Sequence, residues 1–126
     1  LAKFLGMEIP ESNNVYGLID CGGRMKEFAA ALQRFRGAEV RLKVSQFDGA
    51  QSIRMDTPDA SFHAYKSLDS EFLFNGAVAG EAEPVCQFTR ELYNVLHQAG
   101  FRTRFDVYDE DGATLATIGE DFSPAS

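Results

Sequence analysis

The sequence predicts an α+β fold built from two similar β-α-β-β units, with a largely antiparallel sheet and two helices on one face. Two stretches, 37–49 and 100–112, carry the same order of a glycine, an alternating strand and a turn closed by Asp-Gly. Each stretch follows a segment with helical spacing and precedes a second strand-like segment. Because the connection that leads from each opening strand through its helix can be right-handed, as in split β-α-β folds, we expect a ferredoxin-like character.

The repeated residues mainly indicate where helices end and hairpins turn, and they indicate little about a binding or catalytic site. Its first glycines sit where a left-handed helix cap is usual, and its Asp-Gly pairs are typical of hairpin corners. Aligned without gaps, the two stretches share these residues: Gly37/Gly100, Arg41/Arg104, Val44/Val107, Asp48/Asp111 and Gly49/Gly112. The arginine pair is the part of the repeat that suggests a function.

The chain divides into an N-terminal arm (1–14), a single α+β domain (15–119) and a flexible tail (120–126). The domain consists of two similar halves, 15–67 and 71–119.

The first half opens with an interior strand over 15–20, which is apolar on both faces. A helix over 24–36 follows, with an apolar face at helical spacing: Met25, Phe28, Ala29, Leu32 and Phe35. The segment 39–46 alternates as a strand with Val40, Leu42 and Val44 on one face. A returning strand is centred on Ile53 and Met55, and 60–67 suggests one further short strand.

The second half repeats this order. A strand over 71–79 leads to Pro84, which suits the first turn of a helix. The helix covers 85–99 and turns these residues inward: Val85, Phe88, Leu92, Val95 and Leu96. Strands over 102–108 and around Leu115–Ile118 complete the unit, with Thr103, Phe105 and Val107 facing the core.

Composition and charge exclude several classes of protein. A net charge of −7 repels phosphate backbones, so nucleic acid is not expected as a partner. No apolar segment reaches the roughly 20 residues of a spanning helix, so no membrane association is expected. Two cysteines are too few for a disulfide scaffold, and no secretory signal is visible. We therefore expect a cytoplasmic protein.

Motifs for catalysis, cofactors and metals are missing from the sequence. The histidines and carboxylates have no metal-ligand spacing, and neither a dinucleotide fingerprint nor a phosphate-binding loop occurs. We expect no metal and no cofactor, and we assign no catalytic residue. Gly22, Gly23 and Arg24 lie between a strand and a helix, where backbone amides can bind an anion. The structural alternative is a tight strand-to-helix turn.

The face of the sheet without helices is the main candidate binding surface. The alternation directs Arg41, Arg104 and Tyr108 to this face, and Tyr65 and His63 share one face of the further strand. Arginine with aromatic residues is a composition of binding hot spots. An ordinary solvated sheet face is the alternative.

Three functions fit these observations. The first is a non-catalytic, acidic protein-binding module, such as a small regulator, inhibitor or immunity-type protein, whose partner is another protein with a basic surface. A homodimer is also compatible, because sheets of this kind pair face to face or edge to edge. The second is a small-molecule binding domain with a pocket at the sheet or between the halves. The third is a small enzyme that uses Cys21 with Arg24 or His63.

Overall fold

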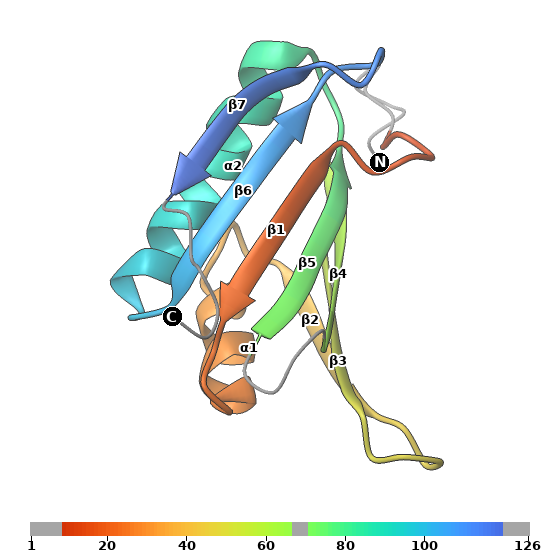
Figure 1. Ribbon diagram of the computed structural model, residues 1–126, viewed down its shortest axis with the longest axis vertical. Coiled ribbons are helices and arrows are strands. Elements are labelled where there is room, and N and C mark those ends of the chain that lie inside the picture. The colour runs from red at the N-terminus through yellow and green to blue at the C-terminus, as the bar shows by residue number, and fades with distance from the viewer. Residues whose placement is uncertain (1–8, 67–70, 120–126) are drawn as a thin grey trace.

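The computed structural model describes residues 9–66 and 71–119. These residues confirm the α+β class: one antiparallel sheet of seven strands with two helices packed on the same face (Figure 1). The elements are β1 (Val15–Asp20), α1 (Met25–Gln33), β2 (Glu39–Val44), β3 (Gln51–Thr57), β4 (Ala60–Lys66), β5 (Glu71–Val78), α2 (Ala82–Gln98), β6 (Arg102–Tyr108) and β7 (Thr114–Gly119). The predicted tail 120–126, the first eight residues of the arm and residues 67–70 lie outside the described residues.

The strand order is β2-β3-β4-β5-β1-β6-β7, and every neighbouring pair is antiparallel. β1 is an interior strand of the sheet, between β5 and β6, as its apolar sequence on both faces predicts. The further strand suggested at 60–67 is present as β4, between β3 and β5.

The two helical connections differ in span. β5 and β6 are separated by β1 alone, so the β5-α2-β6 connection crosses one strand. β1 and β2 are separated by β5, β4 and β3, so the β1-α1-β2 connection crosses three. β2 therefore forms an outer edge of the sheet, whereas β6 pairs with β1.

The core lies between the sheet and the helices and is dominated by phenylalanine. Rings from both helices and three strands contact one another with centroids 5.0–6.2 Å apart, in the range where edge and tilted packing is favourable. The fully buried rings are Phe28, Phe62, Phe74, Phe88, Phe101 and Phe105.

Two of these rings pack directly on the backbone of the central strands. A Cβ atom on Gly17 would lie 2.5 Å from the Phe105 ring, and one on Gly76 would lie 2.3 Å from Cγ of Phe62. Neither glycine has a positive φ, so close approach is what these positions require.

α1 ends at Gln33, so the prediction that this helix continues to Arg36 is wrong. The backbone N–H groups of Arg34 and Phe35 donate to the carbonyls three residues earlier, which tightens the last turn. Arg36 and Gly37 then take left-handed φ values of 51° and 65°, which a continuing helix does not allow. Phe35 stays buried outside the helix, because its ring packs against Phe88 at 5.0 Å.

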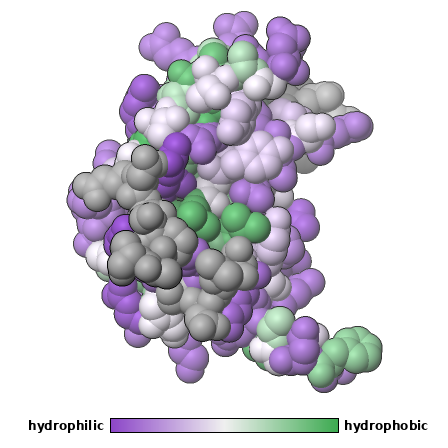
Figure 2. All heavy atoms as spheres, in the orientation of Figure 1, coloured by the Kyte–Doolittle hydropathy of each residue, from purple (hydrophilic) through white to green (hydrophobic). Residues whose placement is uncertain are grey.

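The β2–β3 hairpin projects from the body of the molecule (Figures 1 and 2). Along β2 exposure rises toward the tip, from 38% for Leu42 to 58% for Val44, and Phe47 in the connecting turn is fully exposed. These apolar side chains extend beyond the part of the sheet that the helices cover.

Candidate functional site

The helix-free face carries all five residues that the sequence places on a binding surface. The strand registers align one row of side chains across this face: Arg41, Arg54, His63, Asn75, Tyr16, Asp106 and Thr117. Tyr65 and Arg104 lie in the adjacent row, and Tyr108 ends its strand on the same side. Along β1, β3, β4 and β6, more buried residues alternate with more exposed ones, and the less buried set forms this face.

Arg41 and Arg104, the pair shared by the repeat, do not form one site. β3, β4, β5 and β1 lie between their strands, so at about 4.8 Å per strand their backbones are roughly 24 Å apart. Arg41 binds Glu39 at 2.6 Å, and Arg104 lies 3.6 Å from Asp106. Each arginine therefore belongs to its own local ion pair.

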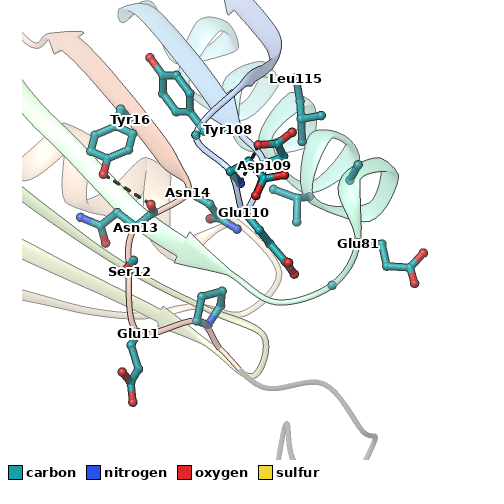
Figure 3. Close-up of a pocket in the computed structure, with 16 residues that line it drawn as sticks. Glu11, Ser12, Asn13, Asn14, Tyr16, Glu81, Tyr108, Asp109, Glu110 and Leu115 are labelled. Carbon is teal, nitrogen blue, oxygen red and sulfur yellow. Dashed lines mark hydrogen bonds between the residues drawn. The ribbon is translucent and has the colours of Figure 1, made fainter.

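A wide groove lies at the end of the sheet where β1 and α2 begin and β6 ends (Figure 3). Its volume is about 1020 Å³. We call it the acidic groove, because five carboxylates and no Lys, Arg or His occur among the described residues that line it. The carboxylates are Glu11, Glu81, Asp109, Glu110 and Asp111, and the apolar or aromatic side chains are Pro10, Tyr16, Ala82, Val85, Tyr108 and Leu115.

Asn14 holds the floor of the acidic groove together. Its backbone N–H donates to the Gly76 carbonyl at 3.0 Å, and its carbonyl accepts the Tyr108 N–H at 2.9 Å. Its side chain donates to the Val78 carbonyl and accepts the Val78 N–H, both at 2.9 Å. This residue, just before β1, thus joins β5, β1 and β6.

The β6–β7 turn positions the central carboxylates. Oδ1 of Asp109 accepts the backbone N–H groups of Asp111 and Ala113 at 2.9 and 2.8 Å, which closes the turn. Figure 3 shows Asp109 and Glu110 in the middle of the groove, whereas Glu11 and Glu81 point outward at its rim. The Asp-Gly signal predicts this turn, but it does not predict that the turn faces the start of β1.

Two tyrosines form the aromatic wall of the acidic groove. The rings of Tyr16 and Tyr108 meet edge to face, with centroids 5.5 Å apart. Tyr16 remains 43% exposed, and its hydroxyl donates to the Asn13 carbonyl at 3.4 Å. A partly exposed aromatic pair beside carboxylates is able to contact an apolar side chain and a cation of the same ligand.

A second, smaller pocket of about 400 Å³ lies on the helix-free face over β2–β5. We call it the basic pocket, because Lys43, Arg54 and His63 line it together with neutral residues: Asn13, Ser52, Ser61, Phe62, Tyr65 and Asn75. His63 and Tyr65 are brought together here, with ring centroids 5.5 Å apart. Arg54 donates to Asp56 and Ser61, at 3.0 and 3.3 Å, which holds its guanidinium over the sheet.

The Gly22-Gly23-Arg24 turn is engaged within the protein. Both glycines have positive φ, 53° and 81°, which side chains rarely adopt. The Gly22 N–H donates to the Asp20 carboxylate at 3.2 Å, so a negative charge already lies beside the turn. The Arg24 guanidinium donates to the Gly100 carbonyl at 3.2 Å and lies 4.4 Å from the centre of the Phe101 ring.

Cys21 is fully buried, and its sulfur lies 3.9 Å from that of Met25. Burial raises the pKa of the Cys21 thiol, which opposes formation of the nucleophilic thiolate. His63 lies on the helix-free face, whereas Cys21 belongs to the core. Cys86 is also a buried free thiol. Within the described ranges, no three His, Cys, Asp or Glu side chains are grouped to hold a metal ion.

Comparison with protein-family models and with curated proteins finds no match. Neither helix of the described chain combines the length and the apolar character needed to cross a bilayer.

Proposed function

We propose that this protein is a non-catalytic binding module that holds a basic segment of another protein in the acidic groove. The single observation that carries this proposal is a groove at one end of the sheet that is lined by five carboxylates, two of them at its outer rim, beside the Tyr16–Tyr108 pair. These carboxylates come from three segments far apart in sequence: the arm, the start of α2 and the β6–β7 turn.

Charge and shape act together in this groove. Carboxylates on the rim attract a cationic segment over a Debye length, about 8 Å at physiological salt, and accelerate its association. Tyr16, Tyr108 and Leu115 offer apolar contacts that persist when salt screens the charges. A small regulator, inhibitor or immunity-type protein uses such a surface to cover a basic site on its target.

Binding of a fluorescein-labelled decapeptide of alternating arginine and leucine, followed by anisotropy, tests the proposal. We expect Tyr108→Ala to weaken binding about tenfold, and Glu110→Gln with Asp111→Asn to weaken it about three- to tenfold. Asp109 is left intact in these variants, because its carboxylate closes the turn. Glu27→Gln, on the exposed face of α1, is the matched control and should leave the affinity unchanged.

Equal loss of affinity in the Glu27→Gln control would contradict the proposal, because net charge rather than the groove would then account for binding. The same holds if the basic peptide does not bind at low salt, or if a peptide with glutamate in place of arginine binds equally well.

The basic pocket favours a second candidate function, the binding of a small anionic molecule. Lys43, Arg54 and His63 supply positive charge or hydrogen-bond donors on one side of the sheet, and Tyr65 and Asn75 supply further polar groups. A shift of the His63 ring signals on addition of inorganic phosphate, lost in Arg54→Gln, would favour it.

We also infer a ferredoxin-like, duplicated origin and a cytoplasmic setting. The β5-α2-β6 unit with β1 between its strands supports the former. The outer position of β2 requires that the first unit has rearranged. Two free, buried thiols agree with a reducing compartment.

A further inference from the structure

The outer strand β2 has an open hydrogen-bonding edge. It is the last strand of the described sheet and pairs with β3 on one side. The Ser45 N–H donates to the Ala50 carbonyl of the β3 side at 2.8 Å. Because these groups alternate along an antiparallel strand, Glu39, Arg41 and Lys43 direct their backbone groups to β3. The intervening Val40, Leu42 and Val44 direct theirs to the free edge.

The hairpin that carries β2 also exposes apolar surface. The described chain has six exposed large hydrophobic residues, and three of them, Leu42, Val44 and Phe47, lie on this one hairpin. Figure 2 shows moderately hydrophobic colour on the projection at the lower right of the molecule, and the acidic groove lies at the other end of the sheet. Apolar surface gathered on an unpaired strand marks an interaction edge.

The charges of β2 select the register in which the strand can pair with a copy of itself. When a twofold axis relates two antiparallel copies of β2 in one continuous sheet, each residue lies opposite a residue whose side chain is on the same face of that sheet. Two registers then place five residues of each strand opposite each other: 39–43 against itself, or 40–44 against itself.

In the first register Glu39 lies opposite Lys43 of the second copy at both ends, and Val40 lies opposite Leu42. In the second, Arg41 lies opposite Lys43 twice, and like charges that face each other are destabilising. The first register also places Arg41 opposite Arg41 of the second copy. Within each copy Glu39 binds the Arg41 guanidinium at 2.6 Å, which reduces the repulsion between the two arginines.

We propose that two copies of this chain pair antiparallel through β2, with Glu39 of each opposite Lys43 of the other. The two sheets then form one continuous sheet across a twofold axis at Arg41. Charged residues prevent an edge strand from pairing with another chain when like charges would meet. On β2, Glu39 and Lys43 of one copy instead lie opposite charges of the other sign on the second copy.

This pairing also completes the rim of the basic pocket. Lys43 lines that pocket, so Glu39 of the second copy lies at its edge in the proposed register. The dimer therefore reduces the positive charge of the basic pocket and leaves the acidic groove, at the other end of the molecule, open.

Light scattering coupled to gel filtration tests the charge pairing. The wild-type chain should elute at twice the 13.9 kDa of one copy. Lys43→Glu should raise the dissociation constant at least about tenfold, and the charge-swapped Glu39→Lys/Lys43→Glu variant should restore it, because the two charges exchange places. Glu27→Gln serves as the surface control, and circular dichroism verifies that each variant is folded.

Disulfide trapping tests the register. Residues opposite each other at a non-hydrogen-bonded position have Cα atoms about 4.5 Å apart, which a disulfide spans. Arg41→Cys should therefore give a covalent dimer on mild oxidation, whereas Leu42→Cys and the wild type, with its two buried cysteines, should not. A monomeric wild type, a charge swap that fails to restore pairing, or a dimer trapped by Leu42→Cys in place of Arg41→Cys would each overturn the proposal.

Discussion

Arg36 connects three parts of the molecule through one side chain. Its guanidinium donates two hydrogen bonds to one oxygen of Glu91 on α2, at 3.1 and 2.8 Å, and lies 3.5 Å from Asp59 in the β3–β4 turn. It also lies 4.8 Å from the centre of the Phe88 ring. These contacts compensate for a left-handed φ of 51°, which is unfavourable for any residue with a side chain.

The Arg36–Glu91 pair predicts a pH dependence of stability. Hydrogen bonds from Arg36 lower the pKa of Glu91 in the folded state. As the pH falls below the ordinary glutamate range, the unfolded chain binds a proton before the folded chain does, so the folded state loses this stabilisation. We expect Glu91→Gln to reduce the free energy of unfolding by up to about 1 kcal/mol at pH 7 and by much less at pH 3.

Urea unfolding at both pH values measures this difference. In an Arg36→Ala background, the effect of Glu91→Gln should change much less with pH, because of the two side chains that lower the pKa of Glu91 only Gln87 remains. A difference that stays the same from pH 7 to pH 3 in the wild-type background would contradict the assignment.

At the scale of elements, β1 and β5 each have a glycine that leaves room for a phenylalanine ring of the neighbouring strand, Phe105 on β6 and Phe62 on β4. Gly76 lies under Phe62, which in turn packs against Phe74 at 5.0 Å and Phe88 at 6.0 Å. A glycine inside a strand costs conformational entropy, and here the close approach of the ring compensates for that cost.

Gly76→Ala should therefore destabilise the protein by about 1–3 kcal/mol, because the new methyl group overlaps the Phe62 ring. Replacing Phe62 by leucine in the same chain should recover part of this loss, so the two changes together should cost less than the sum of the single changes. Gly22→Ala is the control, because a Cβ there has open space around it. Its destabilisation should simply add to that of Phe62→Leu. Additive effects of Gly76→Ala and Phe62→Leu in thermal unfolding would disprove the steric account.

Prediction from the sequence succeeded for features that depend on a single helix or strand and not on its neighbours in the fold. The alternation of 102–108 and 39–44 assigned the correct face to every residue, because a strand has a period of two regardless of its neighbours. The end of α1 was predicted wrongly, because the contacts of Arg36 with α2 and the β3–β4 turn favour a left-handed residue there. The acidic groove was missed because its walls come from segments that only the sheet order brings together.

At the scale of the whole molecule, the features proposed for binding are separated. The acidic groove lies at one end of the sheet, and the β2–β3 hairpin projects at the other (Figure 1). Between them the core encloses both thiols, with Cys21 fully buried and Cys86 8% exposed. The proposed partner and the proposed second copy would therefore use separate surfaces, while Cys21 stays out of contact with solvent.

The thiols should therefore report global unfolding. In a Cys86→Ala background, we expect Cys21 to react with a disulfide reagent only at the rate at which the protein opens, because burial both blocks access and raises the pKa of the thiol. Added denaturant should accelerate labelling in proportion to unfolding. An exposed cysteine placed at Gln46 is the control and should react at once. Immediate labelling of Cys21 in the folded protein would instead favour a reactive, enzyme-like thiol.

The sequence by itself determined the class of fold, the type of nearly every element and the two faces of three strands (β2, β4 and β6), since these depend on periodicity and on turn residues close in the chain. The tertiary structure alone decided the strand order. That order separates Arg41 from Arg104, places β2 at an open edge and brings the start of β1 against the β6–β7 turn. Periodicity carries no information on which strands become neighbours, because pairing depends on how the helices and phenylalanine rings fill the space above the sheet.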